Sequence, residues 1–221
     1  MNLAVFGGSG RVGTAVLRLA TTRGWTVRAL VRPSSQCREE TGIKIIRGSL
    51  DSSSDVLMTL HGAHAVLCLY GPRSAQSNPF CARATRRVIA EMQVIGVRRL
   101  LCLTGAMVGV LPSNVSLALR AMAVTYRYWC PELAADASEQ ERVVIESQLD
   151  WTLVKPPRLT NSAATDLTRS GPAVHVGLLS HISRDDLATF LLDEARDSQY
   201  VQKRVYICNR ANYEPFGRQV A

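Results

Sequence analysis

An α/β fold, with a parallel sheet covered by helices on both faces, is predicted by three features of the sequence. Short apolar runs bounded by glycine or proline alternate with longer stretches whose apolar residues recur at helical spacing. The first apolar run ends in a group of glycines that leads directly into a helical stretch. The chain has 221 residues, 47% of them hydrophobic, which suits one well-cored domain. Because no repeat or linker divides it, we expect a single domain over residues 1–221.

The amino-terminal half supplies the first strands and helices in strict alternation. Leu3–Phe6 has the composition of a buried parallel strand, and Arg11–Arg23 is an amphipathic helix that Gly24 ends. Thr26–Val31 is the second strand, closed by Arg32-Pro33. Further strands are expected at 43–46, 65–69 and 100–103, and further helices at 54–60 and 80–95.

The carboxyl-terminal half continues this alternation less regularly. A helical stretch fills much of 115–147 and is broken near Pro131. Trp151–Val154 is a sixth strand, which Pro156-Pro157 ends. After a looser region, 184–195 is helical, with Ser183 or Arg184 at its start, and 204–207 is a last strand. Because crossovers between parallel strands are right-handed, the expected strand order is 3-2-1-4-5-6.

The turn between the first strand and the first helix carries three glycines at the spacing G-x-x-G-x-x-G. Gly7 permits a tight turn, Gly10 allows the backbone to approach a pyrophosphate, and Gly13 allows close packing of helix on strand. The helix N-terminus offers free N–H groups and a positive dipole end to phosphates. Directly after a strand and before a helix, the motif predicts a Rossmann-type dinucleotide site. The expected contacts are Gly7, Ser9, Gly10, Arg11, Val12 and Gly13.

The residues after the second strand predict which dinucleotide binds. NAD-binding proteins usually place an acidic residue there, which accepts from the ribose 2′-hydroxyl. This chain has Arg32, with Ser35 three residues later. A guanidinium beside hydroxyl groups suits a 2′-phosphate, which arginine can bind through two hydrogen bonds. The sequence therefore predicts NADP(H) as the cofactor.

Further cofactor contacts are expected where the other strands end, because ligands of such sheets lie beyond the carboxyl ends of the strands. Ser49 and Leu50 follow the third strand and would lie near the adenine. The remaining candidates follow the fourth, fifth and sixth strands and are Leu69, Gly71, Arg73, Thr104, Lys155, Pro156 and Pro157.

Composition argues against several other classes of protein. The net charge of +8 is spread along the chain without an aromatic platform, so we expect no nucleic-acid partner. The longest apolar run, Leu100–Leu111, is too short to cross a membrane. The chain begins in a strand rather than a secretion signal, which favours a cytoplasmic location. The six cysteines have no metal-ligand spacing, so no metal site is expected. Monomer and homodimer both remain open.

These motifs resemble a known family, the atypical short-chain dehydrogenase/reductases of the NmrA-like, NAD(P)H-binding type. The resemblance rests on Gly7–Gly13, Arg32, "LDWTLVKPPRLT" at 149–160 and "HISRDDLATFLLDE" at 181–194, and it spans about the first 208 residues. Within the family, the chain is most similar to the flavin reductase (biliverdin-IXβ reductase) branch. The resemblance implies pyrophosphate contacts at 7–12 and 2′-phosphate contacts at Arg32 and Ser35. It also implies that Thr104 lies near the nicotinamide and Pro156-Pro157 near its carboxamide.

The chain departs from that branch at positions that bear on the reaction. Gly105 stands where the flavin reductases carry a serine, and Arg158 where they carry a histidine. The Tyr-x-x-x-Lys pair of classical members, in which lysine lowers the pKa of the tyrosine, is absent. Tyr126 is followed four residues later by Cys130, and Tyr128 by Glu132.

The resulting hypothesis is an NADPH-dependent reductase of a flat, conjugated or aromatic acceptor. The candidates for the chemistry are Thr104, Arg158 and Tyr126, and the substrate pocket is expected from 104–135 and 155–182. Acceptors such as flavins, quinones or tetrapyrroles delocalise charge and do not need a dedicated acid. Two alternatives stay open. One is a non-catalytic, NADP(H)-sensing regulator of the NmrA-like kind. The other is an isomerase or cyclase that tailors a secondary metabolite.

Overall fold

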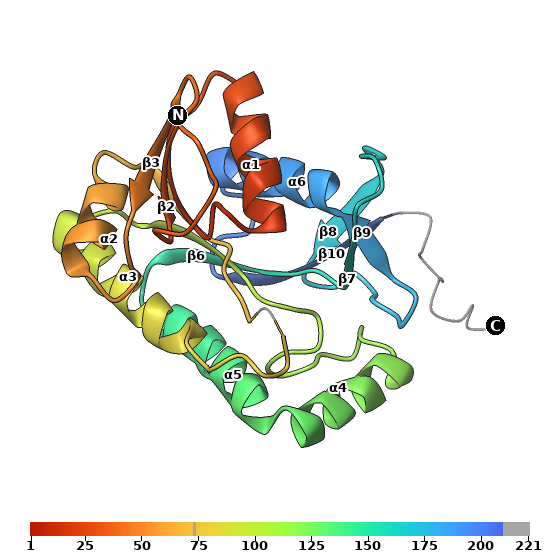
Figure 1. Ribbon diagram of the computed structural model, residues 1–221. Helices are drawn as coiled ribbons and strands as arrows, with labels where there is room; N and C mark the ends of the chain where they lie inside the picture. The colour runs from red at the N-terminus through yellow and green to blue at the C-terminus, as the bar shows by residue number, and fades with distance from the viewer. Residues whose placement is uncertain (73, 210–221) are drawn as a thin grey trace.

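The structure, a computed structural model that describes residues 1–72 and 74–209, confirms the α/β fold. Within these residues one eight-stranded sheet has the order β3-β2-β1-β4-β5-β6-β10-β8 (Figure 1). The first six positions reproduce the expected order 3-2-1-4-5-6. The strands of this sheet are β1 (Asn2–Phe6), β2 (Thr26–Val31), β3 (Ile43–Arg47), β4 (Ala65–Cys68), β5 (Arg99–Leu103), β6 (Asp150–Lys155), β8 (Thr168–Gly171) and β10 (Lys203–Asn209).

Helices cover both faces of the sheet. One face carries α1 (Arg11–Thr22) and α6 (Arg184–Asp197), and the other carries α2 (Ser53–Leu60), α3 (Cys81–Ile95) and α5 (Pro131–Glu146) (Figure 1). A further helix, α4 (Leu117–Trp129), projects from the body next to α5 (Figure 1). The expected break near Pro131 is the junction between these two helices, where Cys130 leaves helical geometry. Each face therefore has its own apolar core.

The central strands are buried on both sides because their side chains serve both cores. In β1, Leu3 and Val5 pack on the α1 side, whereas Ala4 and Phe6 pack on the α2 and α3 side. All four residues of β4 are fully buried. A strand covered on both faces reads as a continuous apolar run, which is why these runs identified the parallel sheet.

The region between β6 and α6 is more ordered than its sequence indicates. β7 (Arg158–Thr160) and β9 (His181–Ser183) pair in parallel as a separate two-stranded sheet. β8 pairs antiparallel with β10, with Tyr206 opposite Gly171. These strands are short and largely polar, so no apolar run marks them.

No helix in the described parts of the chain is long and apolar enough to cross a membrane.

Candidate functional site

The glycine turn forms a cradle without side chains at the carboxyl end of β1. Gly7 has a positive φ of 92°, and a Cβ there would lie 2.9 Å from the backbone of Leu69 and Tyr70. A Cβ on Gly13 would overlap the Gly7 carbonyl oxygen and the Gly8 backbone. The Gly10 N–H donates to the Gly7 carbonyl at 2.9 Å, which closes the turn. Side chains at these positions would fill the space that a pyrophosphate needs.

The N-terminus of α1 is open toward this cradle. Gly10 is the N-cap residue and supplies no capping side chain, and the first turn holds no acidic residue. The free N–H groups and the positive end of the helix dipole therefore face outward, as an anion site requires. Arg11 is exposed at the first helical position, whereas Val12 is buried beneath the turn. Ser9 is half-buried within the turn.

Two arginines rather than one stand at the expected 2′-phosphate position. Arg32 is exposed directly after β2, and its carbonyl accepts from the Ser35 N–H at 2.9 Å. Arg47, at the end of β3, donates from its guanidinium to the carbonyls of Ser35 and Cys37, both at 2.7 Å. The sequence analysis missed Arg47. Its signal is the position of an arginine at the carboxyl end of the strand beside β2, where Val31 and Arg47 are in register.

The loops after β3 and β4 also lie along the carboxyl edge of the sheet. Ser49 is exposed, and its N–H donates to Asp55 Oδ2 at 2.9 Å, while Leu50 packs on the α2 and α3 side. Leu69 is buried against the Gly7 turn, and Gly71 is exposed beyond it. The candidate Arg73 lies outside the described residues.

A buried polar cluster joins the ends of β5 and β6. The Lys155 ammonium is fully buried, forms an ion pair with Glu141 of α5, and donates to the Val108 carbonyl at 2.8 Å. The Thr104 hydroxyl donates to the same Glu141 Oε1 at 3.1 Å. Burial lowers the pKa of Lys155 and outweighs the opposing effect of Glu141. Lys155 was expected as a cofactor contact, but its side chain is committed to this cluster, which leaves only its backbone for a ligand.

Glu141 itself was not among the predicted site residues. It stands on a helix whose sequence resembles an ordinary amphipathic stretch, and a single glutamate there gives no signal of burial. Only 3% of its side chain is exposed, and its second oxygen, Oε2, has no hydrogen-bond donor within bonding distance. Arg204 of β10 lies 3.8 Å from that oxygen. An acidic side chain buried this completely at a sheet edge is a functional candidate.

The other catalytic candidates occupy different surroundings. Arg158 is exposed at the start of β7, opposite His181 of β9, and two residues beyond the buried Pro156. Tyr126 is half-buried on α4, and burial followed by the nearby Cys130 and Cys81 raises its pKa. These neighbours place Tyr126 near the start of α3.

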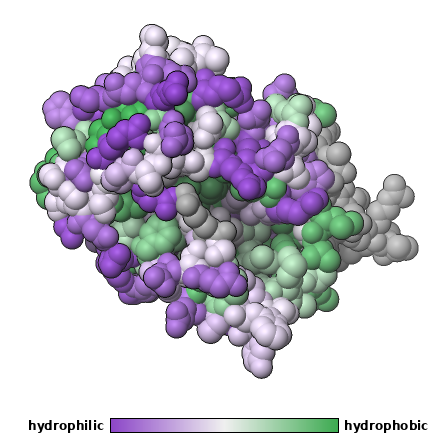
Figure 2. All heavy atoms as spheres, in the orientation of Figure 1, coloured by the Kyte–Doolittle hydropathy of each residue, from purple (hydrophilic) through white to green (hydrophobic). Residues whose placement is uncertain are grey.

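The two segments expected to form the substrate pocket are packed together. Ser116 donates its N–H to the Val176 carbonyl at 3.1 Å, and the Val176 N–H donates to the Asn114 carbonyl at 3.1 Å. Val115, Leu119 and Val176 share a small apolar core with Tyr206. Figure 2 shows the surface hollowed above this region, with hydrophobic residues gathered on the side of α4. The exposed apolar side chains there are Leu117, Met122, Val124, Tyr128, Trp129, Leu178 and Leu179.

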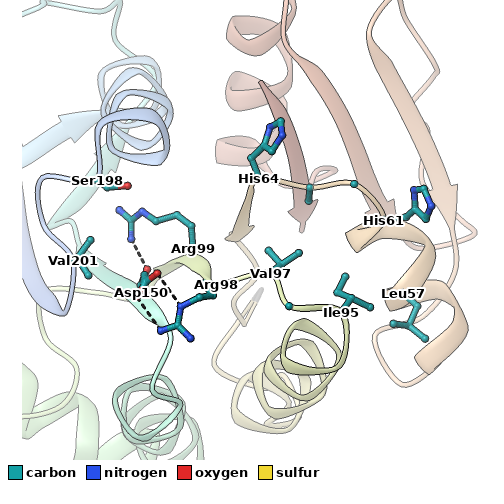
Figure 3. Close-up of a pocket in the computed structure, with 13 residues that line it drawn as sticks. Leu57, His61, His64, Ile95, Val97, Arg98, Arg99, Asp150, Ser198 and Val201 are labelled. Atoms are coloured by element: carbon teal, nitrogen blue, oxygen red, sulfur yellow. Dashed lines mark hydrogen bonds and ion pairs between the residues drawn. The ribbon is translucent and has the colours of Figure 1, made fainter.

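A separate groove of about 830 Å³ lies at the opposite, amino-terminal edge of the sheet. Figure 3 shows His61 and His64 on one side and Arg98 and Asp150 on the other. Arg98 donates to both carboxylate oxygens of Asp150, at 3.3 and 3.2 Å. Because Rossmann-type ligands bind at the carboxyl edge, this groove is not the cofactor site.

The sheet order, the glycine cradle and the open helix N-terminus together define a Rossmann-type dinucleotide-binding protein. The comparison with protein families makes this specific. Residues 7–198 match the NAD(P)H-binding family, and the chain belongs to that family.

Solved structures with the same fold cover nearly the whole chain. ChuY, an anaerobillin reductase from Escherichia coli O157:H7, is 18% identical with a TM-score of 0.74, covering 98% of this chain and 100% of that one. SP1627, a candidate NADH-flavin reductase from Streptococcus pneumoniae TIGR4, is 22% identical with a TM-score of 0.77, covering 95% and 100%. A short-chain dehydrogenase/reductase from Veillonella parvula DSM 2008, solved with NADP, is 13% identical with a TM-score of 0.76 and covers 96% of each chain.

Proposed function

We propose that the protein is an NADPH-dependent reductase of a conjugated or aromatic acceptor, such as a flavin, a quinone, a tetrapyrrole-like molecule or a secondary-metabolite intermediate. The observation that carries this proposal is the cradle of Gly7, Gly10 and Gly13 at the uncapped N-terminus of α1. Arg32 and Arg47 support the phosphorylated cofactor, because two guanidiniums beside one loop suit a 2′-phosphate.

Each side chain of the carboxyl edge then has a role in holding the reactants. The turn from Gly7 to Val12 binds the pyrophosphate, and Ser35 and Arg32 bind the 2′-phosphate. Thr104, Pro156 and Pro157 line the nicotinamide, which when bound supplies hydride to the acceptor. The positions of Thr104 and Pro156 at the ends of adjacent strands support this arrangement.

The acceptor class follows from the chemistry that the site offers. No lysine follows Tyr126 or Tyr128 at the spacing that activates a tyrosine. Conjugated acceptors spread the incoming charge and need only a weak proton donor. The exposed Tyr128 and Trp129, whose rings stand edge to face at 5.6 Å, suit a flat ligand. The reductases among the solved structures with this fold are consistent with such a substrate.

The test is oxidation of NADPH by the purified protein across a panel of flavins, quinones and enones. Gly13→Ala should abolish it, because the added Cβ would overlap the Gly7 carbonyl. Gly24→Asn is the matched control, since Gly24 has a positive φ, which asparagine tolerates, and open space around it. The proposal fails if no member of the panel accelerates NADPH oxidation, or if Gly13→Ala retains full activity.

One observation favours a second candidate, an NADP(H)-sensing regulator that acts through a protein partner. Leu117, Val124 and Tyr128 recur at helical spacing on α4 and are 85%, 57% and 79% exposed. Such an exposed apolar stripe is typical of a protein-binding surface. A partner whose affinity changes between NADP⁺ and NADPH, in the absence of turnover, would support this alternative.

A further inference from the structure

The cluster of Thr104, Glu141 and Lys155 is the most completely buried ionic group at the carboxyl edge among the described residues. Lys155 is 0% and Glu141 3% exposed at the side chain. Burying a charge pair this deeply costs free energy that a hydrophobic pair of similar size would not cost. The pair also stands at the ends of the strands that carry the reaction site, so a role beyond packing deserves a direct argument.

The pair holds a proton in a place where its two positions are close in energy. The ammonium and the carboxylate are in direct contact, and Oε1 receives hydrogen bonds from both Lys155 and Thr104. In a buried site the charged form of the pair loses its hydration, which favours moving the proton from lysine to glutamate. Two charged groups then become two neutral ones without any other atom moving far.

The surroundings restrict where this proton can go. Arg204 and Tyr206 face the pair from β10, Cys102 lies next to it on β5, and Arg120 of α4 lies near Tyr206. Burial raises the pKa values of both Cys102 and Tyr206, so these groups stay protonated and neutral. Thr104 is different, because it is half-buried and stands at the end of β5 where the substrate site begins. It is the way from the buried pair to the substrate.

We propose that Lys155, Glu141 and Thr104 form a proton-transfer chain that protonates the reduced acceptor. This inference rests on the proposed reductase function. The acceptor receives two electrons and one hydrogen from the reduced nicotinamide and becomes an anion. The Thr104 O–H bond then breaks as its proton passes to that anion, and Thr104 takes the proton of neutral Glu141, which Glu141 received from Lys155. Lys155 ends as a neutral amine and Glu141 as a carboxylate. After product leaves, water returns the proton through Thr104.

In this chain Thr104 is the catalytic residue, and Glu141 and Lys155 are positioning residues that store the proton. Together they do the work of the missing tyrosine–lysine pair with different residue types. The geometry also explains Gly109, whose φ is +67° and whose Cβ would overlap the Glu141 carboxylate. Glycine at this position lets the 105–109 turn close over the pair and exclude water from it.

The first test uses the protein without cofactor and measures infrared absorption of neutral carboxyl groups at about pH 7.5, where exposed carboxyls are ionised. We expect a neutral-carboxyl C=O band that Glu141→Gln removes and Thr104→Val shifts. Glu146→Gln, on an exposed glutamate of the same helix, is the control and should leave the band unchanged. Absence of the band in the wild-type protein overturns the proton chain, whatever the activity.

The second test measures single-turnover reduction of a quinone or flavin by NADPH as a function of pH, in H₂O and D₂O. Thr104→Val should slow the reaction about 100-fold with unchanged NADPH affinity, whereas Thr104→Ser should restore the rate to near the wild-type value. Glu141→Gln should remove the solvent isotope effect and flatten the pH profile. Equal rates for Thr104→Val and Thr104→Ser overturn the chain. A carboxyl band without any NADPH oxidation supports the stored proton and contradicts the reductase function instead.

Discussion

At the scale of single residues, the choice between NADP(H) and NAD(H) depends on two guanidiniums. Arg32 is exposed after β2, and Arg47 fixes the loop that contains Ser35. Arg32→Asp places a negative charge where the 2′-phosphate would bind and restores the kind of residue that accepts from a ribose hydroxyl. Because a hydrogen bond to a charged group contributes about 1.5–3 kcal/mol, we expect NADPH affinity to fall roughly 10- to 100-fold relative to NADH.

Titration calorimetry of both cofactors checks this preference. Arg127→Asp is the control, since Arg127 is exposed on α4, away from the β2–β3 edge, and changes the net charge equally. If the two variants changed the NADPH-to-NADH ratio alike, the effect would be one of overall charge, and Arg32 would have no specific role.

Asp186 is the residue whose ionisation most directly links stability to pH. Its carboxylate accepts from the Ser183 hydroxyl at 2.8 Å, from Asn209 at 2.9 Å and from the Thr165 and Asp166 backbone. Burial alone would raise its pKa, but these hydrogen bonds outweigh burial and lower it. A carboxyl whose pKa is lower in the folded protein stabilises it above the unfolded pKa of about 3.9 and loses this contribution as pH falls further.

Asp186→Asn should therefore reduce the free energy of unfolding by about 1–3 kcal/mol at neutral pH. The difference between the two proteins should shrink as pH falls below about 4. Urea denaturation at a series of pH values measures it. Asp185→Asn is the matched neighbour, because its ion pair with Arg18 is half exposed and contributes less than about 1 kcal/mol. A loss that stayed constant down to pH 3 would show that Asp186 acts through shape rather than charge.

At the scale of elements, α3 depends on α5 for its N-terminal cap. Phe80, the N-cap residue of α3, has no capping side chain. Asp136 of α5 instead accepts hydrogen bonds from the N–H groups of Phe80, Cys81 and Ala82, at 3.1, 2.8 and 3.0 Å. A carboxylate there satisfies three otherwise unpaired donors and complements the positive end of the helix dipole.

Asp136→Ala should therefore destabilise the protein by about 2 kcal/mol, since it removes both a cap and a charge–dipole interaction. Glu132→Ala, on an exposed residue of the same helix, should cost much less. Thermal unfolding of both variants measures the difference, and hydrogen exchange locates it. If exchange at the start of α3 stayed as slow as in the wild-type protein, Asp136 would not be its cap.

The same elements show what the sequence could and could not predict. β1, β4 and β5 were predictable because strands buried on both faces must be apolar throughout. The glycine cradle was predictable because only glycine fits its φ at Gly7 and its close contact at Gly13. By contrast, β7, β8 and β9 are short and polar, and they owe their pairing to β10 and to each other. Arg47, Asp136 and Glu141 act on residues 10 to 56 positions away, a relation that local periodicity does not encode.

At the scale of the whole molecule, two buried ion pairs tie the two faces of the sheet to its opposite edges. Lys155 and Glu141 join β6 to α5 at the carboxyl edge, and Arg99 and Glu194 join β5 to α6 at the amino edge. Each pair leaves a buried charge if one partner is lost, so both helical layers are held in fixed positions on the sheet. The carboxyl-edge pair lies among the loops proposed to hold the cofactor, and the amino-edge pair lies beside the groove of Figure 3.

A cofactor that binds only this assembled edge must stabilise the whole domain. At a free concentration of 100 times Kd, binding adds about 2.7 kcal/mol to the free energy of unfolding. For a protein of this size, that corresponds to a rise in Tm of about 5–10 °C. We expect NADPH to give this shift in a thermal-unfolding assay, NADH at the same concentration to give a smaller one, and Gly13→Ala to give none. Gly24→Asn should retain the wild-type shift. An equal response to NADH and NADPH would contradict the proposed role of Arg32 and Arg47, and no response to either would contradict binding at the glycine cradle.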